Sequence, residues 1–272
     1  MLMTLNLNPL FRSSTVVAAA TPIRIGSSTL TAATAALQAK YPGFVPFTAA
    51  VSQVINAGQI DYDAVMLQMK KRFSHNYSAQ VSYTYGQSRG NTSGLTNAPA
   101  SNFQVGDDLH LERNEGPTNF DVPHNFTVSG TALIPRTHGL NVSWVARALS
   151  GSPFTVLNSN FDPDQNGVQA EPLPAGSYSG TGNDPYTLEG YRAERNGARG
   201  PGFFEFDTRI GYGVNLHGRR LEISADIFNL TNHTNFGNPG NDQASASSFL
   251  VLTGYSTSYT PRKVQVGARF EF

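Results

Sequence analysis

Segments of about ten residues in which apolar and polar side chains alternate are the feature that most constrains this chain. The last of them runs from Lys263 to Phe272. Its apolar side chains belong to Val264, Val266, Ala268, Phe270 and Phe272. This period of two is typical of a β-strand with one apolar and one polar face. The segment is longer than the mean strand of soluble proteins, which has about five or six residues, and its length suits a tilted crossing of a lipid bilayer.

The same alternation predicts six further strands along the chain. They cover Val65–Phe73, Tyr77–Gly86, Asn125–Ile134, Leu140–Arg147, Glu205–Leu216 and Arg220–Ile227. A weaker eighth strand is expected from Phe47 to Asn56, and Thr31–Lys40 could form a short helix capped by Thr31. We therefore expect residues 1–41 to be an irregular segment, such as a barrel loop or turn, and residues 42–272 to form an antiparallel sheet.

The connections between these strands alternate between short and long. The short turns are Ser74–Asn76, Pro135–Gly139 and about His217–Arg219, and the long loops are Ser88–His124, Ser150–Gly202 and Asn232–Arg262. In an up-and-down antiparallel sheet, this alternation places every long loop at one end and every short turn at the other. Outer-membrane β-barrels have this asymmetry, with short periplasmic turns and long external loops.

Alternation by itself does not tell which face of the sheet is covered. In a soluble β-sandwich the apolar face is buried, whereas in a barrel the apolar face meets lipid and the polar face lines the lumen. Three features favour the barrel: the loop lengths, aromatic residues near strand ends such as Phe73 and Phe270, and mixed charges such as Glu205 and Arg209 on the polar face. An open sheet cannot stand alone in lipid, so the chain either closes as a small barrel or is part of a larger one. The long loops favour the larger barrel.

The composition narrows the classes of function. Lys+Arg and Asp+Glu both number 19, and a net charge of zero argues against a nucleic-acid binder. The absence of cysteine excludes disulfides, thiolate nucleophiles and cysteine-based zinc sites. No apolar run is long enough for a membrane-spanning helix, and Met1–Ala20 lacks the positive start and unbroken apolar run of a signal peptide. We expect no enzymatic activity and no cofactor.

Five motifs in order along the chain resemble one family. They are DYDAVMLQMKKRF at Asp61–Phe73, SYTY at Ser82–Tyr85, SGSPFTV at Ser150–Val156, NGARGPGFFEFD at Asn196–Asp207 and FNLTNHTNFGNP at Phe228–Pro239. With its terminal aromatic strand, the chain resembles the C-terminal barrel of TonB-dependent receptors of the Oar-like type. The resemblance implies an all-β fold made of the C-terminal strands of a larger up-and-down barrel in the outer membrane. The family's plug domain and TonB-interacting segment are not found in this sequence.

The resemblance also implies partners for the chain. Outer-membrane lipid would surround the barrel, an unidentified external ligand would be taken up, and TonB would act only through the plug domain. A terminal strand that ends in an aromatic residue is implied to be read by the barrel-assembly machinery. This assigns a role in assembly to Val264, Val266, Phe270 and Phe272. An ordinary final strand is the alternative, although an exposed strand edge is a physical template for strand addition.

Several polar motifs receive structural interpretations. Asp162, Asp164 and Asn166 have the spacing of a calcium loop, but Leu173 stands where a bidentate Glu is expected, so a polar loop is favoured over a metal site. The glycine-rich segment Gly197–Gly202 precedes a strand rather than a helix and is interpreted as a loop that leads into that strand. The six histidines, expected at turns and loops, form no metal-ligand pair; they are His75, His110, His124, His138, His217 and His233.

An asparagine series is expected to shape the external end of one hairpin, because Asn side chains can satisfy the backbone groups of loops. Its members are Asn229, Asn232, Asn235 and Asn238. His233, within the same segment, is expected to be structural.

The sequence leaves three functions open. The first is energy-coupled uptake of a ligand through the external loops, and the second is a structural or adhesive surface protein through which nothing passes. The third is a soluble carbohydrate-binding sandwich, which requires solubility without detergent. A plug and a TonB-binding segment encoded upstream of Met1 would distinguish the first from the second.

Removal of Phe272, or its replacement with Asp, is expected to impair assembly of the complete protein into the outer membrane, because the aromatic end of the terminal strand is lost. The measurement is the amount of folded protein in isolated outer membranes. Normal amounts of either variant would contradict the assembly role.

Overall fold

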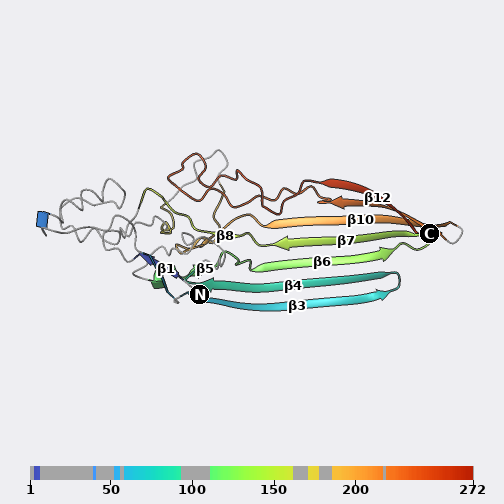
Figure 1. Cartoon of the computed structure of the whole chain (residues 1–272), viewed down its shortest axis with the longest axis horizontal. Helices are drawn as coiled ribbons and strands as arrows, with labels where there is room; N and C mark the ends of the chain where they lie inside the picture. Colours follow the sequence, from blue (N-terminus) through green and yellow to red (C-terminus); the bar gives the residue numbers. More distant parts are fainter. Residues whose placement is uncertain are drawn as a thin grey trace.

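One antiparallel sheet dominates the computed structural model, which describes residues 3–6, 39–40, 52–55, 58–92, 111–161, 171–177, 186–216 and 219–271. Its strands are hydrogen-bonded in the order β12-β11-β10-β7-β6-β4-β3, and the short β5 pairs with β4 (Figure 1). Each long strand therefore lies beside the long strands that precede and follow it in the chain. This is the up-and-down topology that the alternating loop lengths predict.

All seven strands expected with confidence are present. The long strands are β3 (Ile60–Ser74), β4 (Tyr77–Gly90), β6 (His124–Leu133), β7 (Leu140–Leu149), β10 (Phe203–Leu216), β11 (Arg219–Phe228) and β12 (Lys263–Glu271). β3 begins five residues earlier than its alternation indicates, and β4 continues to Gly90. In these extensions Asp61 is paired with Arg89, and Asp63 with Gln87. Sequence alternation did not reveal the extensions for two reasons. In β3 the phase inverts, so that Asp61 and Asp63 share the face of Val65 and Leu67. In β4 the extension Gln87–Gly90 carries no apolar side chain on either face.

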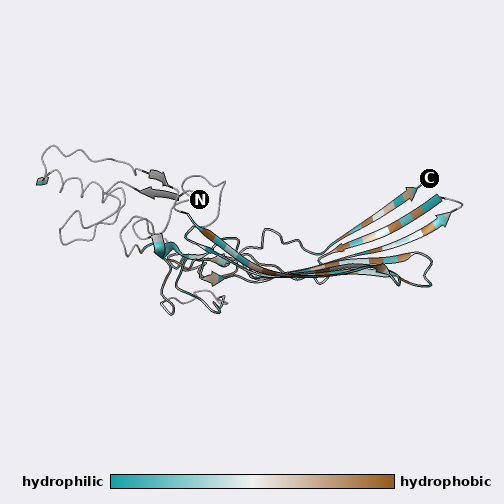
Figure 2. Ribbon diagram, turned by 90° about the horizontal axis from the view of Figure 1, so that it is seen from below, coloured by the Kyte–Doolittle hydropathy of each residue, from teal (hydrophilic) through white to brown (hydrophobic). Residues whose placement is uncertain are grey.

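The register aligns the apolar residues of neighbouring strands on one face. Val264, Val266 and Phe270 of β12 lie opposite Ile227, Ala225 and Leu221 of β11. The alignment continues across the sheet to β3, where Leu67 lies opposite Tyr83. Alternating hydrophobic and hydrophilic bands along the strands are visible in Figure 2. The sheet therefore has one apolar face and one polar face over its whole width.

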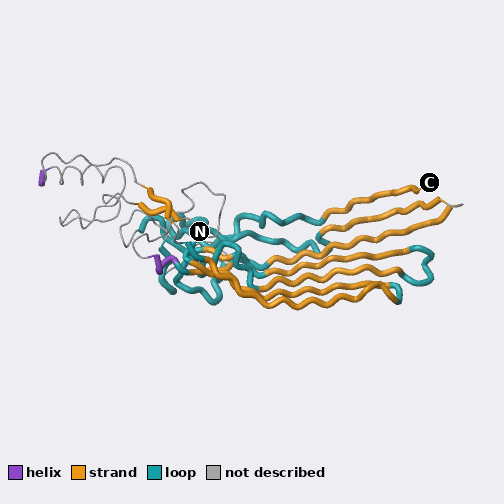
Figure 3. The backbone as a smooth tube through the Cα atoms, turned by 60° about the horizontal axis from the view of Figure 1, so that its bottom comes forward, coloured by secondary structure: helices purple, strands orange, loops and turns teal. Residues whose placement is uncertain are grey.

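The two ends of the sheet differ in the way the sequence predicts. Short connections join β3 to β4 and β6 to β7 at one end, where His75, Asn76, Arg136 and His138 adopt positive φ angles. The long connections all lie at the opposite end (Figures 1 and 3). They contain the small elements η4 (Leu111–Asn114), β5 (Gly116–Pro117), β8 (Pro153–Phe154) and β9 (Ala198–Arg199).

The buried hydrophobic core lies in these long loops and not on the sheet. Among the described residues, it consists of Phe154, Val156, Leu173, Ala198, Phe249 and Leu250. Phe249 and Val156 are completely buried. The apolar face of the sheet stays exposed by comparison, with Met69 at 75% and Val266 at 73% of full exposure. A soluble sandwich would cover that face, and no described element does so.

The weaker strand expected from Phe47 to Asn56 was wrongly placed in the main sheet. Ser52–Ile55 forms β2, which pairs with β1 (Met3–Asn6) in a separate two-stranded sheet. Four residues are too few to cross a bilayer, which takes about nine to eleven in a tilted strand. Of the expected helix Thr31–Lys40, only residues 39–40 are described. Within the described part of the chain, no helix is long and apolar enough to span a membrane.

The outer strands of the sheet are β3 and β12. β3 is followed by a short turn and β12 is preceded by a long loop, so both strands run from the loop end toward the turn end. Each presents one backbone edge that no described strand pairs with.

Trp144 packs across its neighbouring strand at Gly130, the residue directly opposite it in the register. A Cβ atom at Gly130 would overlap the indole ring. We expect Gly130→Ala to displace the ring and to lower the free energy of unfolding by about 1–3 kcal/mol. Trp144 is the only tryptophan in the sequence, so its emission during urea unfolding reports the change directly.

Gly254→Ala provides the control, because no heavy atom lies within 4 Å of the Cβ position there. That variant should unfold like the parent protein. Equal unfolding midpoints for both variants would contradict the close packing at Gly130.

Candidate functional site: the polar face of the sheet and the loop end

Oppositely charged side chains pair across neighbouring strands on the polar face. Arg147 of β7 contacts Glu205 of β10 at 2.5 Å, and the Glu205 side chain is 9% exposed. Arg209 of β10 contacts Asp226 of β11 at 3.5 Å. Within each pair the two residues lie directly opposite each other in the register. The mixed charges that the sequence indicates on the polar face therefore form ion pairs across strands.

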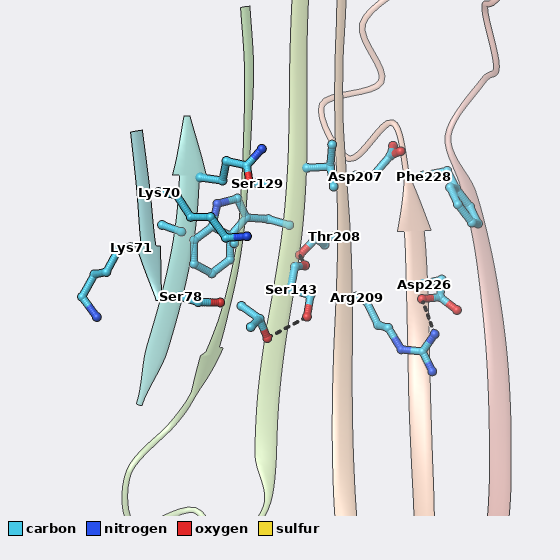
Figure 4. A pocket seen from close by; sticks show the side chains of 16 residues that line it. Lys70, Lys71, Ser78, Ser129, Ser143, Asp207, Thr208, Arg209, Asp226 and Phe228 are labelled. Carbon is cyan, nitrogen blue, oxygen red and sulfur yellow. Dashed lines mark hydrogen bonds and ion pairs between the residues drawn. The ribbon is translucent and has the colours of Figure 1, made fainter. Parts of the chain in front are cut away.

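Beside these pairs, the polar face forms a depression of about 410 Å³. Two neighbouring rows of paired residues line it (Figure 4). One row runs from Lys70 through Gln80, Ser129 and Val145 to Asp207, and the other from Ser78 through Thr131, Ser143 and Arg209 to Asp226. The centre therefore carries short hydroxyl side chains, with charged side chains on both flanks.

The hydroxyls in the depression are suited to hydrogen bonding. Ser143 Oγ donates to Thr131 Oγ1 at 2.9 Å. Hydroxyl groups both donate and accept, so such a surface can be wetted or can exchange partners with a passing polar solute. The arrangement indicates a polar surface that water can wet.

At the loop end, asparagine side chains close the ends of the strands. Asn229 is completely buried, and its amide nitrogen donates to the carbonyls of His233 and Thr260 at 3.0 and 2.9 Å. The Asn235 side-chain oxygen accepts from Phe204 N at 2.8 Å, and its amide nitrogen donates to the Phe204 carbonyl at 2.9 Å. The predicted role of the asparagine series in shaping the external end of this hairpin is confirmed.

Arginines hold the other loops to the end of β4. Arg195 donates to the carbonyls of Asn114, Gly90 and Gly116 at 2.7, 2.5 and 3.2 Å. Desolvation by burial lowers the pKa of Arg195 to about 10, so it remains charged at neutral pH. Arg89 binds Glu194 through two hydrogen bonds of 3.1 and 2.6 Å. Segments far apart in the sequence are thereby fixed together above the sheet.

The family of the chain follows from a comparison with known proteins. A family model described as an outer membrane beta barrel domain matches residues 4–265. The chain belongs to this family. No curated protein matches the chain. This outer-membrane β-barrel domain therefore has its apolar face in contact with lipid and its polar face toward the lumen, as the sequence predicts for a barrel.

The predicted assembly residues lie at the edge of the barrel sheet. Val264, Val266 and Phe270 share the lipid-facing side of β12, with exposed fractions of 63%, 73% and 48%. Phe272 lies outside the described residues. Since β12 is an outer strand, its free edge is available for strand addition. The assembly role of these residues stays a prediction.

The remaining candidate residues that the structure describes do not form one site. Asp162, Asp164 and Asn166 lie outside the described residues, and Leu173, at the position where a calcium loop needs Glu, is buried in the loop core. His124 was expected in a loop but is the first residue of β6, where its ring lies 2.8 Å from the hydroxyl of Tyr83.

Other structural expectations agree with the barrel as described. His233 contacts the ring of Phe204 edge-on and hydrogen-bonds with Asn229, in agreement with a structural role. The glycine-rich segment Gly197–Gly202 leads into β10 as expected. Among the described residues, no cluster of three His, Asp or Glu side chains could hold a metal ion.

Sequence reasoning missed the loop core and the arginine network of this barrel domain. Phe154 and Val156 are apolar residues of SGSPFTV, a segment that is too short to show periodicity. Phe249 and Leu250 form a short apolar pair in the next long loop. The signal for a loop core was the presence of apolar residues in loops that are otherwise rich in Gly, Asn and Ser. Large apolar side chains are usually buried.

The assignment of the two faces is tested by Leu67 and Gln68, which lie next to each other midway along β3. Leu67 is on the lipid face and Gln68 on the lumenal face, and both side chains are exposed. We expect Leu67→Arg to destabilise the protein by about 2–4 kcal/mol, the cost of a cation near the bilayer midplane. Gln68→Arg should change stability by about 0.5 kcal/mol or less.

The measurement is the urea unfolding midpoint of the complete protein in phospholipid vesicles. If both arginine variants lost the same stability, the assignment of lipid and lumenal faces would be contradicted.

Proposed function

We propose that this outer-membrane barrel is part of a TonB-dependent receptor of the Oar-like type and takes up a ligand across the outer membrane. Three of the motifs that carry the resemblance meet at the loop end. Asn238 of FNLTNHTNFGNP donates to the carbonyl of Pro153 in SGSPFTV at 3.2 Å. A Cβ atom at Gly200, in NGARGPGFFEFD, would overlap the side chain of Asn238, and one at Gly151 would overlap the carbonyl of Gly200.

This meeting of motifs is the observation that supports the proposal most strongly. Residues that resemble the family are used to build one external structure, and the two glycines allow its backbones to approach closely. An external structure of this kind is suited to hold a ligand above the lumen. The polar depression below it offers the ligand hydroxyl and charged groups along the lumenal wall.

In this proposal the barrel supplies the ligand-binding loops and the lumenal wall. Energy would come from TonB through a plug domain. The second candidate is a structural or adhesive surface protein, which the ordered loop end also supports, because a rigid external surface can bind a partner without any transport.

TonB coupling distinguishes the two candidates. The complete protein encoded by the gene, purified in detergent, is expected to bind the soluble periplasmic domain of TonB from the same cells. The binding should be lost when the region encoded before the barrel is deleted. In planar bilayers the complete protein should stay closed, because a plug fills the lumen.

A complete protein that binds no TonB would overturn the uptake proposal and favour the surface-protein alternative. An open pore in the bilayer would likewise contradict a plugged receptor. The deleted form serves as the control for barrel integrity, since it should still migrate as a heat-modifiable folded barrel.

A further inference from the structure

A second cavity, of about 370 Å³, lies where the external loops meet the lumenal face of the sheet. Arg147 and Phe203 line it from the ends of β7 and β10, and Phe236, Asn238 and Tyr255 line it from the loop that follows β11. Arg147 is on the lumenal face, since it pairs with Glu205 there. The cavity therefore lies at the external mouth of the lumen, and its size is within the usual range for small-ligand sites.

Three aromatic rings follow one another beside this cavity, and two of them, Phe236 and Tyr255, line it. The rings of Phe236 and Tyr255 have centroids 5.9 Å apart and planes inclined by 26°, and Tyr255 and Tyr259 follow at 4.8 Å and 31°. The backbone fixes their positions, because Phe236 and Tyr255 form an antiparallel bridge and Gly237 N donates to the Gly254 carbonyl at 2.9 Å. Tyr255 is nevertheless 65% exposed. Its ring is thus rigidly held and accessible to a ligand.

Small polar groups line the cavity as well, beside the apolar side chains of Val122, Leu149 and Pro201. The polar groups come from Ser152, Asn238, Ser256, Thr257 and Ser258. Of the described residues that line the cavity, Arg147 alone has a charged side chain. Glu205 neutralises that charge at 2.5 Å, and the guanidinium also lies 5.5 Å from the ring centre of Phe203. The cavity therefore offers aromatic faces and neutral hydrogen-bonding groups.

This chemistry selects among ligand classes. An anionic ligand favours uncompensated cations, which these lining residues do not supply. A wholly apolar ligand would desolvate the serine and threonine hydroxyls without giving them partners. A sugar has an apolar C–H face that can lie on an aromatic ring and a rim of hydroxyls that can hydrogen-bond to small polar groups.

We propose that this cavity is a carbohydrate-binding site. Tyr255 supplies the stacking surface, and the loop hydroxyls and Asn238 bind the hydroxyl rim of the sugar. The inference rests on the proposed uptake function, from which it takes the external approach of the ligand. It adds the chemical class of that ligand. Carbohydrate binding itself does not require energy coupling.

The test is calorimetric titration of the complete protein with cellohexaose, xylohexaose and maltohexaose as probes. The detergent must be an amine oxide, because glucoside and maltoside detergents would compete for the site. At least one probe is expected to bind. Tyr255→Ala should weaken that binding about tenfold or more, which corresponds to about 1.4 kcal/mol. Tyr255→Phe keeps the ring and should retain the binding.

Phe161→Ala is the matched control, because Phe161 is also an aromatic residue of the loop end, is 58% exposed and does not line the cavity. Unchanged heat-modifiable migration of Tyr255→Ala shows that the barrel is intact, and an unchanged protease digestion pattern shows the same for the loops. The inference is overturned if no probe binds, or if Tyr255→Ala and Phe161→Ala bind equally well.

The two proposals can fail separately. Probe binding that depends on Tyr255 in a protein that does not bind TonB would overturn uptake and leave the carbohydrate site standing. TonB binding without any probe binding would overturn the carbohydrate site and leave uptake standing.

Discussion

The need to pair every backbone polar group inside the hydrocarbon layer is the constraint on which the rest of this structure depends. Lipid offers no hydrogen bonds, so each N–H and C=O at that depth needs a partner in the protein. The antiparallel ladders from β3 to β12 meet this need for every interior strand. Side chains are then free to differ on the two faces, with apolar residues toward lipid and hydroxyls and ion pairs toward the lumen.

The loop end faces water instead of lipid, and it is stabilised in the same way as a soluble protein. It has a buried core that includes Phe249 and Val156, and its backbone groups are satisfied by the side chains of Asn229, Asn235 and Arg195. Asn235 hydrogen-bonds to Phe204 at the start of β10, so the loops are attached to the strands themselves. A rigid barrel thereby positions a rigid external surface, which is what ligand recognition needs.

The sequence was sufficient to predict the strands, their order and the asymmetry of the connections. A period of two reports directly which face of a strand each residue occupies, so Val264 and Val266 could be placed without a structure. The same pattern was weak where both faces are polar, as in Gln87–Arg89, and misleading for Ser52–Ile55, whose partner is Met3–Asn6.

The contacts of the loop end could not be derived from the sequence. Asn238 and Pro153 are separated by 85 residues, and Arg195 and Gly90 by 105. No local period specifies such pairs, and tertiary packing decides them. The cavity beside Tyr255 depends on five stretches of the chain that meet in this way, so aromatic and serine residues in the sequence gave no sign of a common site.

The shared direction of β3 and β12 limits how this sheet can become a ring. Placed side by side, the two strands would pair in parallel, and the same would hold wherever β12 of one copy met β3 of another. Identical copies of this sheet therefore cannot build an all-antiparallel pore, whatever their number. An all-antiparallel ring would need a second, different sheet. Its two outer strands must both rise toward the outside, and its number of strands must be odd.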